Sequence, residues 1–274
     1  MSSRKQLVVN ADDFGFTPGV NQGIVEAHRS GILTATTLMA NGDAFDDAVR
    51  LAQQTPSLDM GCHLVLVGGR SLVTGRPFPP TVGRLLAALA RRQIAVFDEL
   101  AQQVRRIVAA GLRPTHLDTH KHAHLAPPVL DAVARLSEEF QIPWVRSPFD
   151  FAMRAVKPAP LGTRLAGAAI ATQRGRFRRV LAQHGCRTTD HFAGFQITGR
   201  FGTAELLEVL RQLPAGSTEL MCHPGRCGAD LRQAPTRLQE SREAELAALM
   251  APETRAELER GGIELVNYTS LSAC

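Results

Sequence analysis

The chain has 274 residues, of which 44% are hydrophobic and 21% are charged, an ordinary composition for a soluble globular protein. No apolar run approaches the roughly 18 residues that a membrane-spanning helix needs, and the run after the basic start is too short for a signal peptide. A formal net charge of +5 does not by itself indicate nucleic-acid binding. We therefore expect a cytoplasmic protein that has no nucleic-acid partner.

The cysteines carry no sign of a disulfide framework. Their number is odd, they are scattered, and no two of them form a C-x-x-C motif, which is typical of reduced thiols. They are Cys62, Cys186, Cys222, Cys227 and Cys274.

Short β-rich apolar runs alternate with longer stretches whose apolar residues recur at helical spacing. Strands are predicted at residues 7–10, 36–41, 60–67, 115–120, 144–147, 191–195, 219–223 and 263–268. Helices are predicted at residues 19–29, 45–53, 97–110, 128–140, 204–213 and 240–260. Repeated strand–helix units favour a parallel sheet. We therefore predict an α/β fold, a single TIM-like β/α barrel over residues 1–274 with seven or eight parallel strands. The barrel can be regular or distorted.

Two adjacent carboxylates, Asp12 and Asp13, come directly after the first predicted strand. The C-terminal ends of barrel strands carry the chemistry of such folds. Neighbouring residues in a regular strand point to opposite faces, so both side chains reach one site only where the chain turns, and Gly15 favours a turn here. A strand-end turn or a helix cap without catalytic function explains this motif equally well.

The densest group of polar side chains lies in residues 115–124. In an extended chain residues two apart share a face, so one carboxylate and four imidazoles are expected on one side. They are His116, Asp118, His120, His122 and His124. Neutral imidazole is a common metal ligand and a nearby carboxylate can orient it, which favours a metal site over a solvated histidine-rich loop.

Two further histidines, His63 and His223, lie in or at the end of apolar predicted strands. Each by itself is more typical of a core histidine, and becomes a candidate ligand only because a metal site is already suspected. By alternation Cys62 and Cys222 face the other way, so we interpret them as packing residues. Aspartates and histidines from four strands could converge on a divalent cation that activates water and polarises a carbonyl.

These motifs resemble those of the YdjC-like carbohydrate deacetylase family, which includes chito-oligosaccharide and hopanoid-associated deacetylases. The matching stretches are residues 9–15, 19–21, 23–24, 61–63, 115–120 and 221–224. The resemblance implies a β/α barrel with one divalent metal that hydrolyses the acetamide of an N-acetylated saccharide or glycolipid and releases acetate. Magnesium is the metal usually assigned in this family, and Zn²⁺ or another transition metal is the alternative.

The resemblance also implies residue roles. By position, the metal ligands are Asp13, His63 and His120, the water-activating base is Asp12, and the acid that protonates the leaving amine is His223. Which of the two aspartates is the base and which is the ligand stays open. Lys121 departs from the family's run of histidines, so we place His122 and His124 near the substrate.

Two other functions remain open on the sequence. A histidine-rich barrel can hold two or three metals for phosphate transfer, so a multi-metal phosphoesterase is one alternative. The other is a non-catalytic metal-binding or carbohydrate-binding module, against which the presence of both aspartates and all the motif histidines argues. The sequence leaves open which acetylated sugar or lipid carrier is used, and whether the chain forms a homodimer.

Residues 151–189 contain eight basic side chains and no acidic one. They are Arg154, Lys157, Arg164, Arg174, Arg176, Arg178, Arg179 and Arg187. On a helix Ile170, Phe177, Val180 and Leu181 would share one side, with most arginines on the other. One interpretation is a barrel helix with a solvated basic face. The other is a basic insertion or lid that contacts an anionic membrane surface or the charged part of a lipid-linked substrate.

Overall fold

One parallel sheet organises the chain. The computed structural model describes residues 4–154 and 160–271, so Lys157 and Cys274 lie outside the described residues. The strands of this part follow the order β5-β4-β3-β2-β1-β7-β6, and β8 pairs with β1. The strands are β1 (Lys5–Phe14), β2 (Ala35–Leu38), β3 (Asp59–Leu64), β4 (His116–Thr119), β5 (Trp144–Val145), β6 (His191–Ala193), β7 (Gly216–Cys222) and β8 (Ile263–Leu265).

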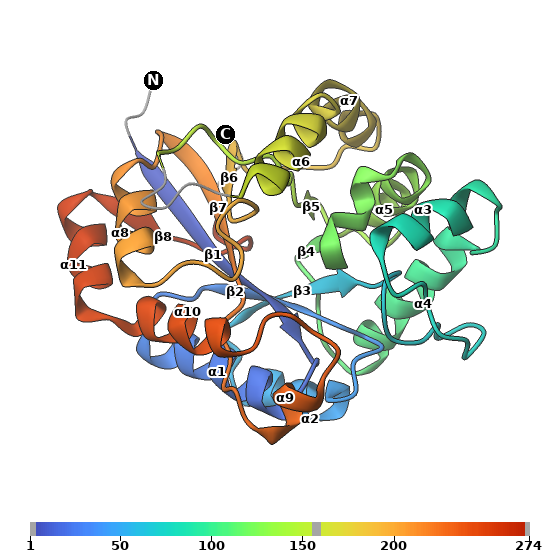
Figure 1. The fold of residues 1–274 in the computed structure, drawn as a ribbon, viewed down its shortest axis with the longest axis horizontal. Coiled ribbons are helices and arrows are strands. Elements are labelled where there is room, and N and C mark those ends of the chain that lie inside the picture. Colours follow the sequence, from blue (N-terminus) through green and yellow to red (C-terminus); the bar gives the residue numbers. More distant parts are fainter. Residues whose placement is uncertain (1–3, 155–159, 272–274) are drawn as a thin grey trace.

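The sheet curls until its two edges approach each other. Isolated parallel bridges join Trp144 to Arg187 and Asp150 to Phe192, so the edges at β5 and β6 touch at two points. The helices pack around the outside of the sheet (Figure 1). They are α1 (Pro18–Ser30), α2 (Phe45–Gln53), α3 (Val82–Ala90), α4 (Val96–Ala109), α5 (Pro127–Glu139), α6 (Leu161–Ala171), α7 (Arg174–Gln183), α8 (Thr203–Arg211), α9 (Ala229–Gln233), α10 (Glu240–Met250) and α11 (Pro252–Arg260). The predicted β/α barrel is confirmed, in a distorted form.

Every predicted strand overlaps an observed one, whereas the helices differ in several places. Residues 240–260 form two helices, because Pro252 lacks the backbone N–H that a continuous helix needs and instead begins α11. The helices α3 and α9 were not predicted. They have nine and five residues, and α3 buries only Leu85 and Ala88.

The prediction that the chain stays extended from residue 116 to residue 124 is wrong. β4 ends at Thr119, and a 3₁₀ turn, η1 (His120–Leu125), follows in which Lys121 and His122 have φ near 54° and 51°. The backbone N–H of His124 donates to the Thr119 hydroxyl at 3.0 Å, which folds the chain back at the strand end. The histidines after β4 therefore point in different directions.

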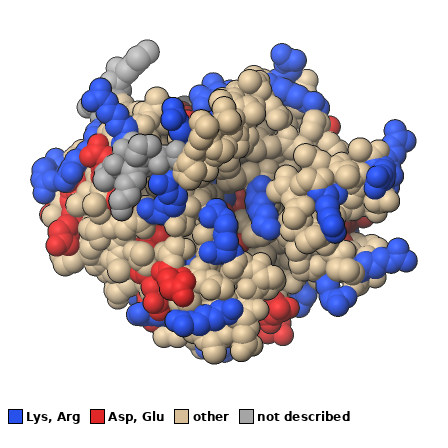
Figure 2. All heavy atoms as spheres, in the orientation of Figure 1, with Lys and Arg blue, Asp and Glu red and all other residues tan. Residues whose placement is uncertain are grey.

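The basic segment 151–189 contains two helices in the place of one. Phe177 and Leu181 of α7 are buried in the main core, with Ile170 and Val180 packed against it, so the predicted apolar side exists. By contrast α6 buries none of its residues. On the face shown in Figure 2, lysine and arginine side chains are spread over many elements and do not gather in one patch. No helix of the described residues has the length and apolar character needed to cross a membrane.

A buried cluster of charges ties the strands together inside the barrel. Arg146, which follows β5, donates from Nε to Glu219 on β7 at 2.6 Å and contacts Asp118 on β4 at 2.7 Å. Its two terminal nitrogens also donate to both carboxylate oxygens of Asp12 on β1, at 2.6 and 2.8 Å. All four side chains are buried. One guanidinium therefore holds three carboxylates on three different strands.

This cluster predicts a large and pH-dependent loss of stability in Arg146→Ala. Removing one partner of a buried ion pair costs about 3–5 kcal/mol, because the remaining charges lose their compensation. The deficit in the free energy of unfolding should shrink between about pH 8 and about pH 5, because the stranded carboxylates have raised pKa values and take up protons in the folded state. Urea unfolding measures both effects, with exposed Arg113→Ala as the matched control. Equal stability of the two variants would contradict the role of Arg146.

Candidate metal and catalytic site

Side chains predicted to act together do meet at the C-terminal ends of four strands. Asp12 and Asp13 lie near the end of β1, and His63 lies near the end of β3. His120 follows β4 directly, and His223 follows β7. Parallel strands of a barrel open at one rim, so these positions share one mouth.

An irregularity in β1 lets both aspartates reach this mouth. The register of β1 with β2 shifts between Ala11 and Phe14, and Asp13 has φ of 69°, in the left-handed region. A regular strand would point the two side chains to opposite faces. Here Asp13 lies against His63 and His120, and Asp12 lies on the side of His223.

One carboxylate oxygen and two ring nitrogens crowd together at the centre of the site. Oδ1 of Asp13 lies 3.3 Å from Nε2 of His63 and 3.2 Å from Nδ1 of His120, and the two ring nitrogens are 3.2 Å apart. This Asp13 oxygen is buried without a hydrogen-bond partner. A buried oxygen without a partner is costly, and one carboxylate with two imidazoles is a common donor set for a divalent cation. The residues therefore fit a metal ion.

Asp118 fixes the orientation of His63. The strands β3 and β4 pair His63 with Asp118, and Nδ1 of His63 donates to Oδ1 of Asp118 at 2.6 Å. This leaves Nε2 free to face Asp13, as in carboxylate–histidine–metal arrangements. Burial alone would lower the pKa of His63, but the carboxylates of Asp118 and Asp12 raise it to about 10. A bound cation would compete with that proton for Nε2.

A second possible set of ligands is Asp12, His63 and Asp118, whose donor atoms also lie close together. Both oxygens of Asp12 are bonded to Arg146, and Asp118 accepts from Thr37 as well as from His63. These oxygens already have donors, whereas the Asp13 oxygen has none. The geometry thus favours Asp13 as the ligand and leaves Asp12 beside it.

Asp12 and His223 face each other across the site. Nε2 of His223 lies 3.9 Å from Oδ2 of Asp12. Burial would raise the pKa of Asp12, but Arg146 lowers it more, so this carboxyl is ionised. Burial lowers the pKa of His223 to about 4, so its imidazole is neutral at neutral pH. The backbone N–H of His223 donates to Glu245 at 2.5 Å, which holds the residue in place.

Three charged residues of the site were missed in the sequence. Besides Arg146 they are Arg242 and Glu245, which α10 carries into the mouth. Nη2 of Arg242 donates to Oδ2 of Asp13 at 2.5 Å, so one oxygen of this carboxylate is held and the other faces the histidines. A charged residue at the end of an apolar strand was a usable signal for Arg146. Nothing in the sequence of α10 distinguishes its buried charges from its exposed ones.

The other histidines of the 115–124 run occupy different surroundings. His116 is inside the barrel, bonded to Asn10 and stacked on Tyr268 with ring centroids 3.9 Å apart. His124 is fully buried, and its ring nitrogens lie within hydrogen-bond distance of the Thr119 hydroxyl and the Arg146 carbonyl. His122 keeps its Nδ1 without a partner. Of the two histidines expected near the substrate, His122 is thus the one with a free polar atom.

Comparisons with known proteins identify the family of this chain. A family model described as YdjC-like protein matches residues 6–260. A protein of Brevibacillus brevis named carbohydrate deacetylase is 34% identical over 272 residues, covering 97% of this chain and 99% of that protein. A carbohydrate deacetylase of Geobacillus stearothermophilus is 32% identical over 271 residues, covering 96% and 97% respectively. A crystal structure from Enterococcus faecalis, provisionally described as a cellobiose-phosphate cleavage protein, has a TM-score of 0.78 at 25% identity and covers 99% of this chain and 100% of that one. The chain belongs to the YdjC-like protein family.

Proposed function

We propose that this chain is a metal-dependent deacetylase that removes the N-acetyl group from an N-acetylated amino sugar, in an oligosaccharide or a glycolipid, and releases acetate. The observation that carries the proposal is the unpartnered Asp13 oxygen between His63 and His120, with Asp12 and His223 beside it. The carbohydrate deacetylases that match nearly the whole chain support this class of substrate.

Asp13, His63 and His120 would hold one divalent cation, which when bound lowers the pKa of water and polarises the acetyl carbonyl. Magnesium is the metal that the family resemblance implies. The two imidazoles also suit Zn²⁺ or another transition metal, whereas Mg²⁺ prefers oxygen ligands. The proposal therefore specifies the ligands and one ion, and leaves the element to metal analysis.

The remaining residues move protons. Arg146 holds Asp12 ionised and in one orientation, so this carboxylate is ready to take the proton of the attacking water. His223 is neutral at the start of the reaction, since its pKa is about 4. It must therefore receive a proton before it can protonate the departing amine, and Asp12 at 3.9 Å is the nearest source. We assign His122, whose buried Nδ1 has no hydrogen-bond partner, to contact with the sugar.

The direct test is acetate release from a panel of N-acetylated saccharides and glycolipids, with and without a chelator. A deacetylase releases acetate only without the chelator and binds close to one metal ion per chain. A multi-metal phosphoesterase would release phosphate and bind two or three ions. A non-catalytic binding module would bind saccharide and release neither product.

Single substitutions should separate metal binding from proton transfer. His63→Ala and His120→Ala should lose bound metal and acetate release together, because each removes one of three ligands. Asp12→Asn should keep the metal and lose about 10²–10⁴-fold in turnover, as expected for a general base. Elemental analysis and acetate release measure the two properties. His184→Ala, a partly exposed histidine bonded to Glu138 and remote from the cluster, should change neither.

Two outcomes would contradict these roles. Full metal occupancy in His63→Ala or His120→Ala would remove that residue from the ligand set. Loss of metal in Asp12→Asn combined with retention in Asp13→Asn would exchange the roles of the two aspartates.

The proposed acid role of His223 makes a prediction about the leaving group. An acid matters most when the leaving group is poor, so His223→Ala should slow acetamide hydrolysis much more than hydrolysis of an activated acetyl ester. The metal content should stay unchanged. The test compares how many-fold the substitution slows acetamide hydrolysis with how many-fold it slows ester hydrolysis. Equal slowing of the two reactions would rule out proton donation by His223.

The basic segment 151–189 supports a further part of the proposal, a lid that contacts an anionic membrane. In α6, Leu161 and Leu165 are 68% and 62% exposed, and exposed arginines of α7 follow. Basic residues contribute about 1 kcal/mol each at an anionic surface, and salt screens this attraction. We expect the protein to sediment with anionic vesicles at low salt only, and not with neutral vesicles. Substitution of Gln for Arg176, Arg178 and Arg179 should abolish this sedimentation.

Sedimentation that does not depend on salt and is the same with anionic and neutral vesicles would exclude the membrane contact. A homodimer formed through the same leucines would instead self-associate without vesicles, which gel filtration of Leu161→Ser and Leu165→Ser variants detects. The cytoplasmic location remains a separate prediction.

A further inference from the structure

One cavity lies apart from the aspartate–histidine site. It has a volume of about 590 Å³ and lies between the loop that follows β3 and the pair of helices α3 and α4. None of the residues that line it belongs to the site described above. Its size lies within the range of cavities that bind small molecules.

Backbone hydrogen bonds hold the loop wall of this cavity in one shape. An antiparallel bridge joins Arg70 to Pro77, and the N–H of Phe78 donates to the Gly69 carbonyl at 3.0 Å. The N–H of Ser71 also donates to the Arg76 carbonyl at 2.9 Å. The loop is therefore a braced hairpin, and the cavity exists before any ligand binds.

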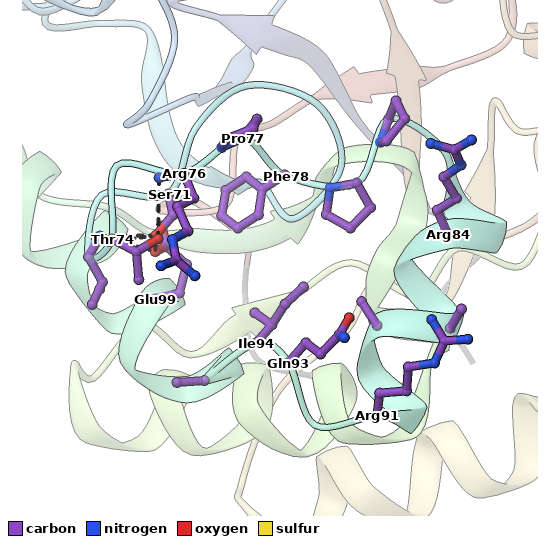
Figure 3. A pocket seen from close by; sticks show the side chains of 16 residues that line it. Ser71, Thr74, Arg76, Pro77, Phe78, Arg84, Arg91, Gln93, Ile94 and Glu99 are labelled. Atoms are coloured by element: carbon purple, nitrogen blue, oxygen red, sulfur yellow. Dashed lines mark hydrogen bonds between the residues drawn. The ribbon is translucent and has the colours of Figure 1, made fainter.

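The charged side chains that line the cavity are nearly all positive. Figure 3 shows Arg76 on one side and Arg84 and Arg91 on the other, with Phe78 and Ile94 between them. Among the residues that the structure describes, none of these three guanidinium groups forms an ion pair. Residues 64–97 contain five arginines and no acidic residue.

The one acidic residue of the lining, Glu99, is already engaged. Its carboxylate accepts from the Ser71 hydroxyl at 2.5 Å, from the Leu72 N–H at 3.0 Å and from Nε2 of Gln103 at 2.9 Å. It is buried and serves to anchor the loop. The positive charge of the three arginines is therefore left for a ligand.

We propose that this cavity binds an anionic small molecule with a flat apolar body. Guanidinium groups pair with sulfonate, phosphate or carboxylate oxygens through charge-assisted hydrogen bonds. The apolar body would lie against Phe78, Pro77 and Ile94. Because the cavity shares no residue with the candidate active site, this site is independent of the proposed deacetylase function.

A matched pair of fluorescent probes tests the proposal. 1-Anilinonaphthalene-8-sulfonate carries a sulfonate on an apolar ring system, and N-phenyl-1-naphthylamine is the same body without the charge. We expect saturable binding of the sulfonate at one site and at least about tenfold weaker binding of the neutral probe, since hydrogen bonds to a charged group are stronger than neutral ones. Binding should weaken as salt is added, because salt screens these exposed arginines.

Substitutions locate the site. Arg84→Gln and Arg91→Gln should each weaken sulfonate binding about three- to tenfold, and the double variant more, whereas exposed Arg113→Gln outside the cavity should have no effect. Ala87→Trp should block binding without changing the charge, because Ala87 is an exposed residue of α3 that lines the cavity. Urea unfolding of each variant checks that the fold is intact.

Three results would overturn the proposal. The first is equal affinity of the protein for the charged and neutral probes. The second is an affinity of the double arginine variant for the sulfonate within twofold of that of the unsubstituted protein. The third is loss of sulfonate binding in His63→Ala, which would place the probe at the metal site. If Ala87→Trp unfolds, the exposed arginine variants still decide the outcome.

Discussion

The pairing of Arg146 with three buried carboxylates is the constraint on which the site depends. Asp12, Asp118 and Glu219 come from three strands, and one guanidinium contacts all of them. Arg146 offsets the effect of burial on both carboxyl groups: it holds the pKa of Asp12 below the usual value, and it limits the rise in the pKa of Asp118, which orients His63. One guanidinium thus faces three carboxyl groups, and burial raises the pKa of two of them, Asp118 and Glu219. The carboxylates of Asp118 and Asp12 in turn raise the pKa of His63 to about 10.

Asp13 shows how the same interior selects a cation site. Arg242 from α10 holds one oxygen of its carboxylate, and the strained backbone at the end of β1 aims the other oxygen at His63 and His120. Asp12, one residue earlier, has both oxygens held by Arg146. Both oxygens of Asp12 thus accept hydrogen bonds, whereas one oxygen of Asp13 accepts none. This difference is the basis for assigning Asp13 as the ligand and Asp12 as the base. The cavity at α3 and α4 shares no residue with this site, and would bind its anion independently of it.

Much of this was available in the sequence, because strands and strand-end motifs are local signals. Short β-rich apolar runs located all eight strands, and Asp12, Asp13, His63, His120 and His223 were found in or directly after these runs. Arg242 was not found, because its contact with Asp13 spans 229 residues. The sequence of a helix also does not distinguish a buried charged residue from a solvent-exposed one. His124 was misplaced on an extended face because the Thr119 hydroxyl turns the chain after β4, a contact that period-two alternation does not contain.

The central claim is that Asp13, His63 and His120 bind one cation. Anomalous diffraction from crystals soaked in Zn²⁺ tests this most directly, because it shows the ion and its ligands together. The account predicts one peak, about 2.0–2.2 Å from Oδ1 of Asp13, Nε2 of His63 and Nδ1 of His120. A peak coordinated instead by Asp12 and Asp118, several peaks in the mouth of the barrel, or no peak there at saturating metal would contradict it.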